Sequence, residues 1–317
     1  MRKRRRARLG AGALMIGIPA SAAALSAGHA FAQPAPERVH ITPHSQHITY
    51  GQELVMDGTE SVADAGHTVA LQFAGRGASA WSDVSSTTVG GDGRFRLTAR
   101  LERSGDVRAL DTSSGVLTAF VTGRNTTATQ PMSSTVPVDV DAALRVRARR
   151  IAVLAGQTVL VRGRLLSALA GRKVSLQARQ SGAWRTLTTT RTRAAGRFVL
   201  RYVTGAAGQA PIRVRFAGDQ LNGRAAVRAG NMTVYRLAGA SWYNDAGQTA
   251  CGFHAYLGVA NRTLPCGTTV SFRYNGRSVN ATVDDRGPYV GGRDWDLNQN
   301  TAAALGFGGV GTVWSSQ

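Results

Sequence analysis

Short runs in which apolar and polar residues alternate dominate the chain beyond its N-terminal segment. The stretch LRVRARR, residues 144–150, shows the pattern, because Leu144, Val146 and Ala148 alternate with arginines. A period of two places successive side chains on opposite faces of a strand, so we expect an outward ladder of Arg145, Arg147 and Arg149. Helical periodicity is scarce, and TAAALGF (301–307), capped by Asn298 or Asn300, is the best helical segment. The pattern predicts an all-β protein.

An internal repeat divides the first two thirds of the chain. GQELVMDG (51–58) recurs as GQTVLVRG (156–163), and GRFRL (93–97) recurs as GRFVL (196–200). Each copy spans about 100 residues with many short strands, which is typical of an Ig-like β-sandwich. We expect two such modules, at residues 33–140 and 141–236. Equivalent tryptophans, Trp81 and Trp184, are expected to pack in the two cores.

The first 32 residues have the layout of a secretory signal peptide. The basic start MRKRRRARLG precedes an apolar run and a small-x-small site, AFA (30–32), so cleavage is expected after Ala32. The remaining sequence has no apolar stretch long enough for a transmembrane helix. We therefore expect a secreted, extracellular protein. In an oxidising compartment, Cys251 and Cys266 are expected to form a disulfide.

Positive charge is concentrated in one segment. The formal net charge of the chain is +20, and residues 141–236 hold 19 basic and 2 acidic residues. Residues 33–140 hold 8 and 11, and residues 237–317 hold 5 and 5. A field of one sign attracts polyanions. The exported location favours anionic wall polymers, anionic lipid headgroups or carboxylates on wall peptides over nucleic acid. The alternative is a solvated basic face without a partner.

Five motifs follow one another in the C-terminal 81 residues, 237–317. They are GASWYNDAGQTACG (239–252), GVANRTLPCGTTV (258–270), NGRSV (275–279), DRGPYV (285–290) and DLNQNTAAALGF (296–307). Their order and spacing resemble the rare lipoprotein A-like (RlpA-like) proteins, which are relatives of the barwin and expansin barrels. The resemblance implies a six-stranded double-psi β-barrel that contacts peptidoglycan glycan strands. It also implies a possible lytic transglycosylase activity, because the best-known members resemble enzymes that cut peptidoglycan chains lacking stem peptides.

The resemblance transfers one catalytic residue, Asp285 of DRGP. The family's glutamate has no counterpart, because CGFHAYLGVAN (251–261) contains no carboxylate; Phe253 stands near its place, and Asn261 stands where the family often has histidine. A single carboxylate can protonate the leaving oxygen and then accept a proton from a sugar hydroxyl. Asp285 is therefore the candidate acid/base, and His254, the one histidine of this segment, is a candidate helper.

Other residues of this segment are candidates for binding or for structure. Sugar rings stack on aromatic faces, so we expect glycan contacts from Trp242, Tyr243, Tyr256, Tyr289 and Trp295, together with Arg286. Packing inside the barrel is the alternative for the aromatic residues. Gly287 and Pro288 are expected to form a turn that Asp285 closes, and Asp296 is expected to close a second turn.

The sequence therefore predicts a wall-associated protein whose barrel binds glycan without cleaving it, or with weak activity. The alternative is a lytic transglycosylase that uses Asp285. No metal or other cofactor is expected. His40, His44 and His47 are interrupted by Pro43 in a linker-like stretch and are read as solvated.

Overall fold

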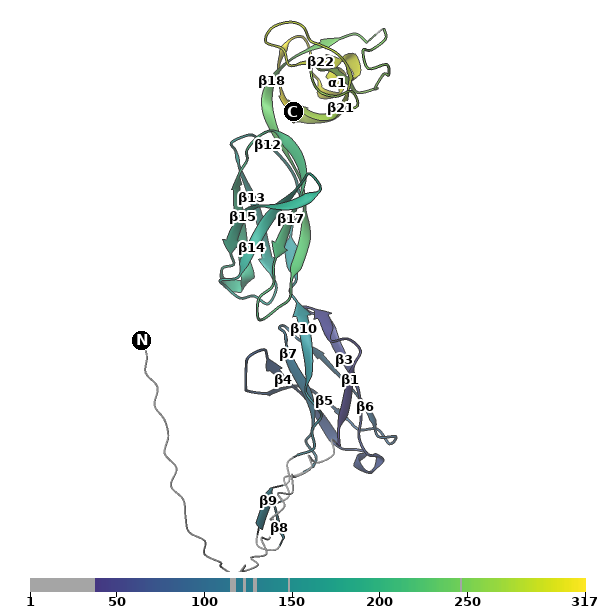
Figure 1. The fold of residues 1–317 in the computed structure, drawn as a ribbon, viewed down its shortest axis with the longest axis vertical. Helices are drawn as coiled ribbons and strands as arrows, with labels where there is room; N and C mark the ends of the chain where they lie inside the picture. Colours follow the sequence, from purple (N-terminus) through teal and green to yellow (C-terminus); the bar gives the residue numbers. More distant parts are fainter. Residues whose placement is uncertain (1–37, 115–117, 122–123, 128–129, 148, 246) are drawn as a thin grey trace, which may run out of the picture. The chain divides into compact units, whose positions relative to one another are not determined.

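A computed structural model describes the chain at residues 38–114, 118–121, 124–127, 130–147, 149–245 and 247–317. Strands make up nearly all of its regular structure, as the sequence predicts (Figure 1). The predicted signal peptide and its cleavage site lie outside the described residues. Within the described ranges, no helix has both the length and the apolar character needed to cross a membrane.

The first repeat forms two sheets around one apolar core, with strand orders β1-β3-β6 and β2-β10-β7-β4-β5. Alternate residues of β6 are buried, so the period of two seen in the sequence selects the side of the sheet that packs. A hairpin of β8 and β9 pairs separately, and the short 3-10 turn η1 precedes β4. The bounds are β1 (His40–Pro43), β2 (His47–Thr49), β3 (Glu53–Thr59), η1 (Val62–Asp64), β4 (Thr68–Gly75), β5 (Ser82–Thr88), β6 (Arg94–Arg100), β7 (Gly105–Asp111), β8 (Thr118–Val121), β9 (Arg124–Thr127) and β10 (Val136–Asp141).

The second repeat has the same strand order around its own core. One sheet is β11-β13-β16, and in the other β12, β18, β17, β14 and β15 follow one another. The first strand of each repeat, β1 or β11, pairs antiparallel with β3 or β13 in one sheet. The second strand, β2 or β12, pairs parallel with β10 or β18 in the other sheet. The bounds are β11 (Leu144–Val146), β12 (Arg149–Leu154), β13 (Thr158–Leu165), β14 (Lys173–Gln180), β15 (Ala183–Arg191), η2 (Ala194–Gly196), β16 (Arg197–Val203), β17 (Gly208–Phe216) and β18 (Ala225–Tyr243).

This change of sheet divides the predicted arginine ladder. β11 ends at Val146, and Arg149 begins β12 in the other sheet. Ala148 lies outside the described residues. A single strand with one outward row of arginines was therefore the wrong prediction, because alternation in sequence does not reveal where a strand transfers between sheets.

The repeat extends to side-chain contacts. Nε of Arg108 donates a hydrogen bond to Gln72 at 2.9 Å, and its guanidinium carbon lies 4.2 Å from the ring centroid of Trp81. The second repeat has both contacts, at 2.8 and 4.2 Å, through Arg213, Gln177 and Trp184. Both indoles are half-buried and lie outside the core clusters, so the prediction that they pack in the cores was wrong. Each ring is instead covered by a cation.

The C-terminal strands close into a ring. β18 runs without a turn past the predicted boundary at Arg236, and its last residues pair with β22 and β23. The ring order is β18-β22-β19-β21-β20-β23, which returns to β18 and gives the six strands predicted. Two pairings, β18–β22 and β19–β21, are parallel. The bounds are β19 (Gly258–Ala260), β20 (Thr269–Tyr274), β21 (Arg277–Asp285), β22 (Trp295–Asn298) and β23 (Gly311–Ser315).

One helix and one disulfide support this ring. Helix α1 (Gln299–Leu305) begins two residues before the predicted segment, because Asn298 is the cap and accepts the N–H of Thr301 at 2.9 Å. It ends at Gly306, whose φ of 67° suits a residue without Cβ. The predicted disulfide between Cys251 and Cys266 is confirmed. Closing a loop of about 15 residues stabilises the fold by roughly 3 kcal/mol in the chain-entropy model.

A buried carboxyl group without a hydrogen-bond partner among the described residues directly follows β3. Both oxygens of Glu60 are buried, and within the described residues neither has a hydrogen-bond partner. Burial, together with the negative charges of Asp111 and Asp64, raises the pKa of Glu60 from 4.5 to about 7. The folded state therefore favours the protonated form of this side chain.

Glu60→Gln tests this assignment. A raised pKa gives a contribution to stability that is complete below about 4.5 and is lost as the pH rises through about 7. We expect the variant to be more stable than the parent by about 1–3 kcal/mol at pH 8 and nearly equal at pH 4.5. Thermal unfolding of the full mature chain at both pH values measures this. An equal difference at the two pH values would contradict the assignment, and the exposed Glu53→Gln is the matched control.

Candidate functional site

Two adjacent carboxylates end strand β21. Asp284 is fully buried, and Asp285 is half-buried. Successive side chains of a strand point to opposite faces, so the two groups have different surroundings despite being neighbours. The loop between β18 and β19 covers both of them through main-chain N–H groups.

Asp285 has one fixed oxygen and one available oxygen. Oδ1 accepts the N–H of Ala250 and the N–H of Arg286, both at 2.8 Å. Oδ2 accepts no hydrogen bond from any described residue. The structural role and the chemical role considered for Asp285 are therefore compatible, because each uses a different oxygen. The carboxylate is held in place without being saturated.

Asp284 was not selected from the sequence as a site residue. Its Oδ2 accepts the N–H of Ala255 at 2.9 Å, and its Oδ1 is buried without a partner in the described structure. Burial raises the pKa of this carboxyl, against the opposing hydrogen bond from Ala255. A Cβ at Gly258 would lie 2.3 Å from Oδ2, so glycine is needed beside the carboxylate. The sequence signal was the acidic residue directly before DRGP.

Tyr243 lies among carboxylates. Its hydroxyl is buried and has no hydrogen-bond partner within the described residues. Burial raises the pKa of Tyr243, and the charges of Asp284, Asp285, Asp245 and Asp296 raise it further. The phenol therefore stays protonated as a hydrogen-bond donor. The ring is half-buried with its hydroxyl enclosed, and the sugar contact expected of Tyr243 stays a prediction.

Asp296 contributes a second half-buried carboxylate. Its Oδ1 accepts the hydroxyl of Ser241 at 2.8 Å, across the paired strands β18 and β22. Burial raises the pKa of Asp296, and the charge of Asp285 adds to the rise, whereas Ser241 and Arg293 oppose it. The prediction that Asp296 closes a turn was wrong. Its partner is a side chain on the neighbouring strand.

His254 contacts an acidic residue, Asp245, that lies near this cluster. Its Nδ1 lies 3.2 Å from Oδ2 of Asp245, whose side chain is 8% exposed, whereas the histidine is 50% exposed. Asp245 is itself anchored by its N–H, which donates to Gln299 at 2.6 Å. Asp245 is one of the four carboxylates that raise the pKa of Tyr243. The structure thus links His254 to the cluster through Asp245.

Arg286 braces the neighbouring loop. One terminal nitrogen donates to the carbonyls of Asn261 and Leu264 at 3.1 and 2.9 Å, and the other lies 3.0 Å from Sγ of Cys266. Its predicted glycan contact stays a prediction, because these bonds involve only the two terminal nitrogens. Gly287 and Pro288 are buried, and the carbonyl of Pro288 accepts a hydrogen bond from Arg262 at 2.9 Å. The turn expected at these two residues stays a prediction.

The aromatic candidates divide between core and surface. Trp295 is 1% exposed and packs edge-on against Phe272, with ring centroids 5.0 Å apart, so its predicted sugar contact was wrong. Trp242, Tyr256 and Tyr289 are 45%, 79% and 81% exposed, so their rings are accessible. Tyr256 directly follows Ala255, which binds Asp284, and Tyr289 lies four residues after Asp285.

Metal ligation finds no support in the described part of the chain. No group of three or more histidine, cysteine, aspartate or glutamate side chains there is arranged to hold a metal ion. Main-chain N–H groups bind Asp284 and Asp285, and the hydroxyl of Ser241 binds Asp296.

Comparisons with known proteins concern this same segment. A family model described as lytic transglycolase matches residues 237–314. The chain is 39% identical over 99 residues to a probable endolytic peptidoglycan transglycosylase RlpA of Synechocystis sp., covering 26% of this chain and 29% of that protein. It is 43% identical over 77 residues to a protein of the same name from Aquifex aeolicus, covering 22% and 34%. The chain thus spans about a third of the length of these relatives.

Gly258→Ala tests the packing of the buried carboxylate. The added Cβ would overlap Oδ2 of Asp284 inside a paired strand, so we expect a loss of about 1–3 kcal/mol in the free energy of unfolding. Gly308→Ala, where the added Cβ has open space, is the control. The double variant Gly258→Ala/Asp284→Ala should lose less than the sum of its single changes. Additive losses in thermal unfolding would contradict the proposed contact.

Proposed function

We propose, from the premise that residues 237–314 form an RlpA-like double-psi β-barrel, that this domain binds peptidoglycan glycan strands and cleaves them by lytic transglycosylation. The observation that carries the proposal is the arrangement of Asp285, with one oxygen held by two N–H groups and the other available. The names of the two relatives support the same activity. The sequence alone favoured binding without cleavage.

Asp285 acts first as acid and then as base. Its protonated Oδ2 donates to the glycosidic oxygen as the bond from that oxygen to C1 of the muramoyl sugar breaks. The resulting carboxylate then accepts the proton of the same sugar's C6 hydroxyl, while that oxygen bonds to C1. The product is a 1,6-anhydro ring, the proton returns to Asp285, and no water is consumed.

Neighbouring groups prepare this step. Burial raises the pKa of Asp284 and Asp296, so these two side chains retain protons at a pH where exposed carboxyls are ionised. This lowers the negative charge around Asp285, and neither residue takes the place of the family's glutamate. The proposed roles of Asp284 and Asp296 are electrostatic.

Substrate binding is assigned to the exposed rings of Trp242, Tyr256 and Tyr289, which offer flat apolar faces to sugars. Binding without cleavage is the second candidate function. It is favoured by Phe253, 41% exposed, near the position where the family pattern has its glutamate. His254, oriented by Asp245, is proposed to assist proton transfer in the cleaving form.

The rest of the chain is proposed to deliver the barrel to the wall. The shared strand order supports Ig-like sandwiches at residues 33–140 and 141–236, followed by the barrel at 237–317. A signal peptide cleaved after Ala32 would export the protein. The 19 basic residues of the middle module support association with anionic wall polymers.

Asp285→Asn tests cleavage directly. Mature protein, residues 33–317, is incubated with amidase-treated sacculi, and 1,6-anhydro products are quantified by mass spectrometry. We expect the variant to lose at least 100-fold in rate, because the amide neither donates nor accepts the reacting proton in the required way. Asp294→Asn, which removes a carboxylate bonded to Arg236 and Gly239, is the matched control and should retain activity.

The outcomes separate the two candidate functions. Loss of product in Asp285→Asn but not in Asp294→Asn supports cleavage. Sedimentation with sacculi, without any anhydro product from the parent protein, would contradict cleavage and support the binder.

Tyr256→Ala/Tyr289→Ala tests the binding surface. Removing two exposed rings should weaken sedimentation with peptide-free glycan about tenfold, since each stacked aromatic contributes about 0.5–1.5 kcal/mol. Thermal stability should remain unchanged, because both side chains are about four-fifths exposed. Unchanged binding would contradict the assignment. Val310→Ala, an exposed apolar change elsewhere in the barrel, is the control.

A further inference from the structure

An apolar groove of about 670 Å³ lies between the two sheets of the second repeat. Its lining comes from both sheets, with β11 and β13 on one side and β12 and β18 on the other. The half-buried side chains of Ile151, Leu160 and Val227 contribute to its apolar floor. The volume falls within the range of small-molecule sites in proteins. The groove belongs to the middle segment and shares no residue with the carboxylate cluster of the barrel.

Four arginines line the same groove, namely Arg145, Arg147, Arg162 and Arg164. All four are exposed, and Arg145 lies directly opposite Arg164 in the pairing of β11 with β13. Like charges at such positions destabilise a sheet. Nε of Arg164 donates to the carbonyl of Ala195 at 2.7 Å. None of these four arginines, which we call the arginine rim, forms an ion pair with a carboxylate among the described residues. The positive charge of the arginine rim is therefore not neutralised by those residues.

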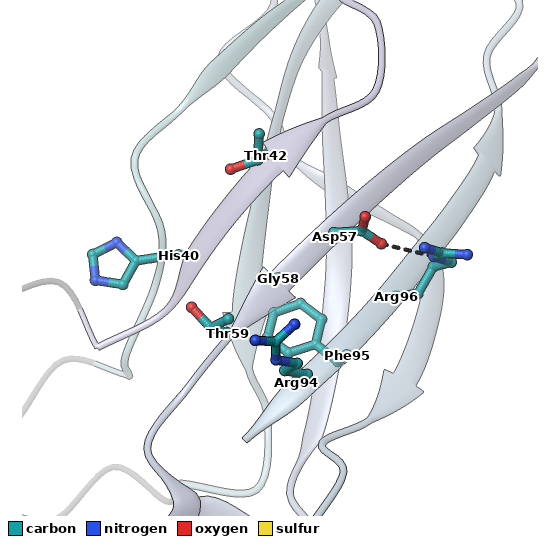
Figure 2. Close-up of a pocket in the computed structure, with 8 residues that line it drawn as sticks. All are labelled: His40, Thr42, Asp57, Gly58, Thr59, Arg94, Phe95 and Arg96. Atoms are coloured by element: carbon teal, nitrogen blue, oxygen red, sulfur yellow. Dashed lines mark hydrogen bonds and ion pairs between the residues drawn. The ribbon is translucent and has the colours of Figure 1, made fainter. Parts of the chain in front are cut away.

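The first repeat provides an internal comparison. At the repeat offset of 105, His40, Thr42, Asp57 and Thr59 occupy the positions of the four arginines. Figure 2 shows this face, where Asp57 pairs with Arg96. Asp57 is also 2.7 Å from His44, and these hydrogen bonds lower its pKa to about 2. The same face is therefore internally neutralised in the first repeat, and the arginine rim is specific to the second.

We propose that this groove binds an anionic amphiphile, with a phosphate head at the arginines and an apolar chain along the floor. Guanidinium groups bind phosphate oxygens in a bidentate manner, and no acidic residue lines the groove to repel them. Removing the half-buried apolar floor from water is favourable, and a hydrocarbon chain can cover it. A hydrophilic sugar–phosphate polymer has no such chain. This inference goes beyond the proposed activity of the barrel and does not depend on it.

Calorimetry on the mature chain tests the ligand class. The probe is a short-chain phosphatidylglycerol below its micelle concentration, compared with the matching phosphatidylcholine, with glycerol phosphate and with inorganic polyphosphate. We expect the phosphatidylglycerol to bind at least tenfold more tightly than each of the others. Equal or tighter binding of glycerol phosphate or polyphosphate would overturn the proposal in favour of a plain phosphate site. Absence of phosphatidylglycerol binding would also overturn it.

Paired variants locate the site. Arg147→Gln/Arg162→Gln should weaken phosphatidylglycerol binding at least tenfold. Arg185→Gln/Arg193→Gln removes the same charge from exposed positions outside the groove and should leave binding unchanged. Leu160→Asn should weaken binding of the lipid while leaving the weak binding of glycerol phosphate unchanged. Equal losses in the two arginine pairs would overturn the proposal, because binding would then follow net charge alone.

Discussion

Main-chain hydrogen bonds from one loop to two neighbouring carboxylates organise the barrel's candidate site. The N–H of Ala250 holds Asp285, and the N–H of Ala255 holds Asp284. The disulfide and the cap residue Asn298, which also donates to the carbonyls of Ala255 and Tyr256, fix the loop that carries these donors. Without these contacts, the buried carboxylate of Asp284 would lose its hydrogen bond from Ala255, and the half-buried Asp285 would keep only the N–H of Arg286.

As a consequence, two carboxyl groups that are adjacent in sequence have different surroundings. Asp284 is enclosed and its pKa is raised, whereas Asp285 keeps one oxygen available. Tyr243 and Asp296 share the same electrostatic field. Such separation of neighbouring acidic groups by their surroundings is a recurring basis for acid/base chemistry. Here it arises from strand alternation and one covering loop, while the arginine rim of the middle segment arises from a different sheet.

The sequence predicted local features well, but it predicted less well which side chains point into the core and which segments lie against one another. Strand alternation, the helix cap at Asn298 and the disulfide were predictable because each depends on nearby residues or on compartment chemistry. The burial of Trp295 was missed although the alternation of Trp295, Asp296 and Leu297 in β22 marks it, because the aromatic ring was interpreted as a sugar contact. The role of Asp284 depends on Ala255 and Gly258, almost thirty residues away. The break in the arginine ladder depends on a strand changing sheets.

The role of Asp285 depends on whether its free oxygen contacts the glycan. A crystal structure of the mature Asp285→Asn chain with a peptide-free glycan tetrasaccharide tests this most directly. The account predicts that the side-chain atom in the place of Oδ2 lies within hydrogen-bond distance of a glycosidic oxygen, while the N–H of Ala250 still holds the other atom. A glycan bound away from residue 285, or a side chain whose two polar atoms are both taken by the protein, would contradict it.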